Sequence, residues 1–252
     1  MDTKTYLQRI GLSGGNPAPT IETLRAIQLA HLYTVPFENL DIALGRPIAL
    51  NLERIYNKIV HQRRGGFCYE LNGLLAWLLR ELGYSVTLLS ASSFNDDLSY
   101  GPEYDHLVLL VTCPHDETRW LVDVGWGCGF EAPLRLEHDF AQETIRFLWR
   151  IKHTGEYHSL WQKTVAGEWI PHYRFTLTPR SYDEFAGMCH HHQTSPNSMF
   201  TRKKLCTIFM PEKRVTLSDL KLIITEKDVK KEQDVSENEI PEILQQYFGV
   251  VL

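Results

Sequence analysis

The residue of this chain with the clearest chemical potential is a cysteine at the start of a predicted helix. Cys68 follows Gly65 and Gly66, which allow the backbone a close approach to its neighbours. A thiol in the first helical turn lies at the positive end of the helix dipole, and Arg63 and Arg64 stand just before it. Both effects favour the thiolate, the nucleophilic form of cysteine, so the segment predicts a nucleophile; the alternative is an ordinary buried cysteine. The helix is predicted from leucines that recur on one face: Leu71, Leu74, Leu75, Leu78, Leu79 and Leu82.

A nucleophilic thiol needs a base, and the base needs a group that orients it. His106 opens an aliphatic run that ends near residue 112, and Asp123 lies near the end of a second run that begins at residue 119. The segment 113–118 between them predicts a β-hairpin with a longer loop. With the turn centred near residue 115, Val108 faces Leu121 and His106 faces Asp123. A register slip of one residue would place these two side chains on opposite faces.

Asp123 supports this pairing because it lies in an otherwise apolar strand. An unpaired buried carboxylate is costly there, and His106 is the nearest candidate partner. The carboxylate would hold one imidazole nitrogen and leave the other free for the thiol. The order Cys, His, Asp along the chain is compatible with several thiol enzymes, so the triad alone leaves the reaction open.

The elements that must position these residues change character along the chain. Residues 1 to about 84 are predicted to be helical, with Thr20 and Asn51 as N-caps and residues 36–41 as a loop. Strands follow at 85–91, 104–112, 119–124, 145–151, 156–164 and 168–178, a series that favours a barrel or a strongly curled sheet. Ser181 and Glu184 form a capping-box pattern that predicts a short helix. The remainder predicts strands at 204–210, 213–217 and 220–225, an exposed turn at 226–239 and a terminal helix near 238–248.

Composition narrows the class of protein. The chain has 252 residues and a net charge of −5, which argues against a nucleic-acid-binding protein. No apolar run reaches the roughly 18 residues of a membrane span, and no signal peptide is expected. The five cysteines are irregularly spaced without a CxxC pair, which indicates a cytoplasmic protein with reduced thiols and no structural zinc. The three histidines at 190–192 are predicted to lie in an exposed polar loop, because adjacent histidines do not easily share one metal face.

Several short motifs stand in a characteristic order. Arg-Gly-Gly-Phe-Cys-Tyr-Glu at 64–70 is preceded by Arg-Ile-Gly at 9–11 and Pro-Phe-Glu-Asn-Leu at 36–40. It is followed by Val-Asp-Val-Gly-Trp-Gly at 122–127, Ser-Pro-Asn-Ser-Met-Phe at 195–200 and Tyr-Phe-Gly at 247–249. Over nearly the whole chain, this combination resembles the arylamine N-acetyltransferase family.

The resemblance implies an α+β fold with a papain-like cysteine-enzyme core. A helical bundle over 1–84 would carry the nucleophile, a central antiparallel β-barrel over 85–190 the histidine and aspartate, and an α/β lid would span 191–252. The implied reaction is acetyl-CoA-dependent transfer of an acetyl group to small arylamines, arylhydrazines and N-hydroxyarylamines. It would follow a ping-pong mechanism through an acetyl-cysteine intermediate, without a metal, in a cytoplasmic enzyme of xenobiotic metabolism. Neither nucleic acid nor a membrane is an expected partner.

The resemblance also assigns roles to single residues. Cys68 would be the acetylated nucleophile, His106 would activate it, and Asp123 would orient His106. The acceptor cleft would be lined by Phe37, Trp126 and Phe200, and the family commonly has phenylalanine where Trp126 stands. Contacts with coenzyme A would come from Glu103, Gly125, Gly127, Asn197 and Ser198. A buried ion cluster would tie the cysteine loop to the bundle and comprise Arg9, Glu38 and Arg64.

Other functions remain open on the residues alone. A thiol hydrolase or transglutaminase-like enzyme would use the same three side chains on amide substrates. An aryl-amide synthase would use a larger acyl thioester, and a ligand-binding module would carry an inert cysteine. Consumption of acetyl-CoA with an aromatic amine, compared with amide hydrolysis without coenzyme A, separates the first of these from an acetyltransferase.

Overall fold

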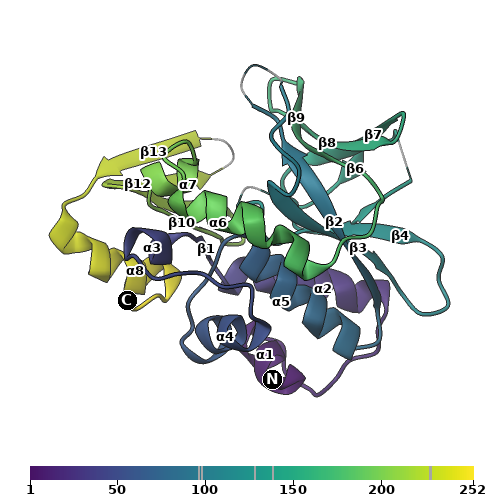
Figure 1. Cartoon of the computed structure of the whole chain (residues 1–252), viewed down its shortest axis with the longest axis horizontal. Helices are drawn as coiled ribbons and strands as arrows, with labels where there is room; N and C mark the ends of the chain where they lie inside the picture. The colour runs from purple at the N-terminus through teal and green to yellow at the C-terminus, as the bar shows by residue number, and fades with distance from the viewer. Residues whose placement is uncertain (96, 98, 128, 138, 227–228) are drawn as a thin grey trace.

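Figure 1 shows the computed structural model of the chain, which describes residues 1–95, 97, 99–127, 129–137, 139–226 and 229–252. Helices from the N-terminal third lie beneath a curled antiparallel sheet, and a smaller sheet with the C-terminal helix lies beside them. The predicted α+β class, with N-terminal helices and an antiparallel barrel, is confirmed. Among the described residues, no helix combines the length and the hydropathy needed to cross a bilayer.

The N-terminal helices pack around α5, Cys68–Glu81, whose leucines are buried on several sides. The two predicted N-caps are confirmed. Thr20 Oγ1 accepts a hydrogen bond from the Thr23 backbone N–H at 3.3 Å, and Asn51 Oδ1 accepts one from Arg54 at 3.0 Å. The other helical elements here are α1 Thr3–Arg9, α2 Ile21–Thr34, α3 Leu40–Ala43, α4 Leu52–Tyr56 and the π-helical turn η1 Asn57–His61.

Within the described part of the chain, eight strands form an antiparallel sheet in the order β5-β4-β3-β2-β9-β8-β7-β6. Its long strands match the predicted ones to within a few residues: β2 Ser85–Ser93, β3 His106–Thr112, β4 Arg119–Val122, β7 Leu148–Thr154, β8 Tyr157–Lys163 and β9 Trp169–Phe175. The short strands β5 Leu134–Arg135 and β6 Gln142–Glu143 were not predicted, because two residues are too few to show a period. One face of this sheet encloses an apolar cluster around Phe130 and Trp149.

The predicted register of the β3–β4 hairpin is wrong by two residues. Leu121 pairs with Leu110, whereas the loop symmetry predicted Val108 as its partner. Side chains alternate between the two faces of a strand, so a shift of two residues keeps each on its predicted face. His106 and Asp123 therefore share one face even though they are not directly opposed.

A second sheet, with five strands among the described residues, has the order β1-β10-β11-β12-β13. Its members are β1 Phe37–Glu38, β10 Leu205–Phe209, β11 Lys213–Ser218, β12 Lys221–Glu226 and β13 Val229–Asp234. The 3₁₀ turn η3, Glu237–Glu239, leads into α8, Ile240–Phe248, whose apolar face packs on this sheet through Leu244 and Phe248. The predicted terminal helix is therefore present.

Local predictions failed where long-range contacts decide the structure. Residues 36–41 are not only a loop, because Phe37 and Glu38 pair with β10 far along the chain and α3 follows. The predicted turn at 226–239 contains β13, whose exposed polar residues form a strand by pairing with β12. The histidines at 190–192 lie in α6, Ala186–Thr194, which continues the 3₁₀ turn η2, Tyr182–Phe185, at the predicted capping box. The next helix is α7, Met199–Arg202.

The division at 84, 190 and 252 stays a prediction. Its second boundary falls inside α6, and β1 from the first segment belongs to the sheet of the last. Helix α6 runs across the predicted boundary at residue 190, and β1 joins the first segment to the sheet of the last segment. The first and last segments therefore meet around one site.

Candidate active site

Cys68 is the first residue of α5 and is 3% exposed. The helix start is closed by Glu70, whose Oε2 accepts a hydrogen bond from the Phe67 backbone N–H at 3.1 Å. The two glycines before it are required by close packing. A Cβ on Gly65 would lie 1.9 Å from the Pro36 carbonyl oxygen, and one on Gly66 would lie 2.8 Å from the Glu70 side chain.

His106 and Asp123 form a buried imidazole–carboxylate pair. His106 Nε2 lies 2.8 Å from Asp123 Oδ2, and both side chains are almost fully buried. The other carboxylate oxygen, Oδ1, accepts hydrogen bonds from Asn72 Nδ2 and from the Gly125 backbone N–H, each at 2.8 Å. A carboxylate with three donors around it is an acceptor, so Nε2 of His106 carries a proton and Nδ1 of the neutral ring has a free lone pair.

Asn72 is a site residue that the sequence analysis missed. It lies one helical turn after Cys68 and is fully buried. Its Nδ2 donates to the Leu107 carbonyl at 2.7 Å as well as to Asp123, and its Oδ1 accepts from the Val124 backbone N–H at 2.9 Å. One amide thus joins α5 to both strands of the hairpin. The available signal was an asparagine on an otherwise apolar helix, which demands polar partners.

The thiol of Cys68 lies beside the start of β3. The backbone N–H of Leu107, the residue after His106, is near enough to lower the pKa of the thiol, and a Cβ on Gly125 would lie 2.7 Å from Cys68 Cα. Burial raises the pKa of the thiol well above its ordinary value, the nearby carboxylates Asp105 and Asp123 raise it further, and only the Leu107 backbone N–H lowers it. A lone thiolate is therefore disfavoured, and ionisation requires a proton acceptor in direct reach.

The predicted help from the upstream arginines is wrong for Arg64. Its guanidinium pairs with Glu38 at 2.7 Å and with Asp41 at 3.0 Å, and it lines a different pocket from the one that contains Cys68. Its charge is therefore balanced locally and does not stabilise a thiolate. His106, held by Asp123, is the candidate acceptor for the thiol proton.

Cys68 and His106 open into one cleft with a volume of about 710 Å³. Its walls come from the first, middle and last thirds of the chain. The strand β1 and the helix α7 contribute side chains to them. The predicted coenzyme and acceptor residues that line it are Phe37, Gly125, Trp126, Gly127, Asn197, Ser198 and Phe200. Cys128, the residue after Gly127, lies outside the described residues.

Glu103 is placed differently from the other predicted residues. Its carboxylate lies 3.4 Å from Arg180 Nη2, its side chain is 70% exposed, and it is not part of the cleft wall. The neighbouring Gly101, Pro102 and Asp105 line the cleft instead. Because Glu103 lies outside the cleft wall, its role in coenzyme binding stays a prediction.

Two cationic side chains in the cleft were also missed. Arg202 and Arg214 line it, and neither forms an ion pair with any residue that the structure describes. Arg202 donates to the carbonyls of Ser198 at 3.3 Å and Asn197 at 3.4 Å, which leaves its charge unneutralised. Arg214 projects from β11 on the same face as Thr216, whose hydroxyl lies 2.7 Å from that of Thr207. This wall suits an anionic group.

His192 is a second buried histidine in the cleft, and its sequence position gave no hint of burial. Ser198 Oγ accepts from the Phe200 backbone N–H at 3.2 Å and lies 3.2 Å from His192 Nδ1. His192 Nε2 lies 3.3 Å from the Asp105 carbonyl and 3.4 Å from its carboxylate. This chain of contacts joins α7 to the residue before His106.

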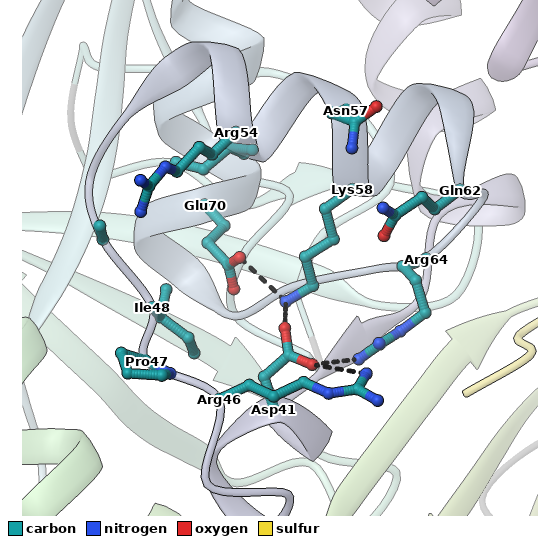
Figure 2. Close-up of a pocket in the computed structure, with 12 residues that line it drawn as sticks. Asp41, Arg46, Pro47, Ile48, Arg54, Asn57, Lys58, Gln62, Arg64 and Glu70 are labelled. Carbon is teal, nitrogen blue, oxygen red and sulfur yellow. Dashed lines mark hydrogen bonds and ion pairs between the residues drawn. The ribbon is translucent and has the colours of Figure 1, made fainter.

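Figure 2 shows the ion network behind the cysteine loop, which differs from the predicted cluster. Its centre is Lys58, in the η1 turn, whose Nζ lies 2.8 Å from Asp41 and 2.9 Å from Glu70 and 3.8 Å from Glu38. Burial alone would lower the pKa of Lys58, but these carboxylates raise it above its ordinary value. Arg9, which was predicted to join the network, instead donates to backbone carbonyls, including Ile59 at 2.9 Å.

Comparison with known proteins gives consistent matches across the chain. The sequence model of a family described as N-acetyltransferase matches residues 20–252. An arylamine N-acetyltransferase from Mycolicibacterium smegmatis is 40% identical over 228 residues, which cover 89% of this chain and 82% of the relative. Human arylamine N-acetyltransferase 1 is 31% identical, with 100% of this chain and 95% of the relative covered.

Solved structures show the same similarity in three dimensions. The arylamine N-acetyltransferase of M. smegmatis superposes with a TM-score of 0.93 at 36% identity, over 99% of this chain and 92% of the other. The enzyme of Mycobacterium marinum, solved in complex with CoA, superposes with a TM-score of 0.91 at 32% identity, over 99% and 93% of the two chains.

Proposed function

This chain belongs to the arylamine N-acetyltransferase family of acyltransferases, and we propose that it transfers acetyl groups from acetyl-CoA to aromatic amines and hydrazines through an acetylated Cys68. The observation that carries the proposal is the buried His106–Asp123 pair, 2.8 Å apart, in the same cleft as the thiol. The CoA complex of the related M. marinum enzyme supports the choice of donor.

The first half-reaction begins with proton transfer from the Cys68 thiol to Nδ1 of His106. The resulting imidazolium is stabilised by the Asp123 carboxylate, so the ion pair forms where a lone thiolate would not. The sulfur attacks the thioester carbonyl, and coenzyme A leaves with the proton from His106. Backbone N–H groups at the start of α5 are the proposed stabilisers of the oxyanion, because the first turn of a helix has donors without helical partners.

The second half-reaction uses the same groups in reverse order. An aromatic amine attacks the acetyl-cysteine carbonyl, His106 takes a proton from the amine nitrogen, and the sulfur of Cys68 leaves and regains its proton. One site that serves donor and acceptor in turn gives ping-pong kinetics. N-hydroxyarylamines would accept the acetyl group on oxygen by the same route.

The cleft offers distinct surfaces for the two substrates. Arg202 and Arg214 provide unpaired positive charge for the phosphates of coenzyme A, beside Asn197, Ser198 and Gly127. Phe37, Trp126 and Phe200 provide flat apolar walls for an aromatic ring; the rings of Phe37 and Phe200 lie 6.1 Å apart. The proposed setting is cytoplasmic conversion of foreign aromatic amines, which the free cysteines Cys68, Cys113, Cys189 and Cys206 support.

Intact-protein mass spectrometry tests this function directly. Acetyl-CoA is expected to add about 42 Da to the chain, peptide mapping to place the adduct on Cys68, and aniline to remove it with formation of acetanilide. An adduct that only water removes would favour a thiol hydrolase instead. A protein that stays unmodified by acetyl-CoA but accepts a larger, carrier-bound acyl thioester would be an aryl-amide synthase.

A further inference from the structure

Trp126 is held by a hydrogen bond that the rest of the proposed mechanism does not require. Its indole Nε1 donates to His172 Nδ1 at 2.8 Å, and His172 Nε2 lies 2.8 Å from Gln162 Oε1. An indole nitrogen can only donate, so Nδ1 of His172 must accept. The proton of the neutral imidazole is therefore on Nε2 and is donated to Gln162. Each partner fixes the role of the next, which leaves one arrangement of the three side chains.

A β-bulge aims His172 at this contact. In the pairing of β8 with β9, Leu160 pairs with Tyr173 but Trp161 pairs with Pro171, so His172 is the extra residue. A bulge turns the extra side chain out of the regular alternation and is common beside functional sites. The His172 carbonyl is also used, since it accepts a hydrogen bond from the Phe94 backbone N–H at 2.9 Å, and Phe94 lines the cleft.

The residues on either side of Trp126 have no side chains that could hold its ring. Gly125 and Gly127 flank it, and Gly127 has a φ of +72°, a conformation that favours glycine. The orientation of the indole therefore depends on its side-chain contacts. Its ring centroid lies 4.9 Å from that of His106 and 5.1 Å from that of Tyr173, in edge-on arrangements. The same indole thus covers the proposed catalytic imidazole and forms part of the cleft wall.

We propose that His172, oriented by Gln162, is a specificity-determining positioning residue that holds Trp126 against His106 and so fixes the width of the acceptor cleft. The substrate class it selects is compact aryl amines over acceptors that carry a second ring opposite the amine. This inference rests on the proposed function, because it concerns the acceptor of the same reaction. His172 and Gln162 touch neither acceptor nor donor in this scheme; they act through Trp126.

The test compares kcat/KM for aniline and for 4-phenylaniline in a double-mutant cycle of Trp126→Phe and His172→Phe. His172→Phe keeps a ring of similar size but removes the acceptor for the indole N–H. The preference for aniline is expected to fall about tenfold in His172→Phe and by a similar factor in Trp126→Phe. In the Trp126→Phe background, His172→Phe is expected to change the preference less than about twofold. His172→Gln, which retains an acceptor, is expected to keep most of the preference.

An unchanged preference in His172→Phe, or equal effects of His172→Phe in both backgrounds, overturns the inference. If His172→Phe does not fold, the same cycle is run with Gln162→Leu, for which a smaller change of the same sign, absent without Trp126, is expected. Acetylation of the wild-type protein by acetyl-CoA is measured in parallel by mass spectrometry. Failure of that acetylation refutes the proposed function, whereas acetylation with additive effects on preference refutes only the role of His172.

Discussion

Behind Cys68, the loop at 64–70 rests on ion pairs, whereas in front of it the thiol faces a cleft walled largely by rings and backbone. The rear network gathers Lys58, Arg64 and the carboxylates of Glu38, Asp41 and Glu70, and each charge has a partner within 4 Å. Figure 2 shows Lys58, Arg64, Asp41 and Glu70 of this network. The front holds two imidazole–carboxylate pairs, His106–Asp123 and His192–Asp105, next to two arginines that have no ion pair among the described residues. The difference shows how one short loop is both fixed and reactive. Matched charges hold the backbone from one side, and unmatched groups remain for substrates on the other.

The largest loss of activity is expected when the sulfur of Cys68 is removed. Cys68→Ala or Cys68→Ser should reduce acetyl transfer at least about 1,000-fold, because no other group can form the thioester. The melting temperature should stay within a few degrees of that of the wild type. Cys113→Ala, at a buried thiol outside the cleft, is the matched control and should retain transfer. Retention of more than a few per cent of activity in Cys68→Ala would remove the sulfur from the mechanism.

The imidazole–carboxylate pair comes next. His106→Gln should slow acetylation by about 100- to 1,000-fold, because burial alone raises the pKa of the Cys68 thiol. Iodoacetamide alkylation of Cys68 as a function of pH measures this, and the curve should move to higher pH. His190→Gln on the exposed side of α6 is the control. A curve that does not move would exclude His106 as the proton acceptor. Asp123→Ala should lower both activity and stability, since it leaves His106 and Asn72 without their shared partner.

The rear network is expected to govern stability more than chemistry. Lys58→Met leaves Glu70 and Asp41 buried without their shared cation, at a cost of about 3–5 kcal/mol in the free energy of unfolding. Urea denaturation measures the loss, with Lys203→Met at an exposed position as the control. Replacing Glu70 by Gln in the same chain should recover part of it. A Lys58→Met protein as stable as the wild type would show that the network does not hold the loop.

The stability of the protein in acid should depend on His172, a buried residue of β9 next to the cleft. Burial lowers the pKa of His172 to about 4, although Asp123 acts in the opposite direction. The unfolded state binds this proton more readily, so stability should fall as the pH drops from about 6.5 to about 4 and change little from this group above that range. The full effect is about 3 kcal/mol. Melting temperatures of the wild type and His172→Phe between pH 7 and pH 4 test it, and equal slopes for the two proteins would contradict it.

The smallest effect is expected from a single arginine of the front. Arg214→Gln should raise the KM for acetyl-CoA about tenfold and leave the kcat nearly unchanged, because it removes one charge-assisted contact made equally before and during the reaction. The KM for aniline should stay the same. Lys230→Gln on the exposed strand β13 serves as the control. A KM for acetyl-CoA that does not respond would place the phosphates elsewhere.

The catalytic residues in the cleft in front of Cys68 were predicted better from the sequence than the ion network behind it, for a physical reason. Cys68, His106 and Asp123 stand at positions where local rules operate, namely a helix start, the first residue of a strand and the residue just after the neighbouring strand. Even the register error did no harm, because a shift of two residues preserves the face of each side chain. The caps at Thr20 and Asn51 were predictable for the same reason, since each bonds a residue three positions away.

The ion network around Lys58 could not be predicted, because tertiary packing decides which charged side chains meet there. Nothing in the local pattern says that Lys58 turns inward at a π-helical turn while the guanidinium of Arg9 donates to backbone carbonyls. The pairing of β1 with β10, more than 160 residues apart, and the burial of His192 are equally invisible to periodicity. Asn72 was the one missed residue with a readable signal, a polar side chain in a buried helix.

The amide of Asn72 also has a consequence for how the protein matures. It links α5 with both strands of the hairpin, so the histidine and the aspartate take their places only when helix and hairpin have docked. Until then the sulfur is an ordinary exposed thiol without a neighbouring base, and in a nascent or partly unfolded chain it reacts with acyl donors only as fast as any free cysteine. Fast acetylation confined to Cys68 should therefore report completed assembly, whereas a chain released too early from the ribosome should react slowly and without preference among its cysteines.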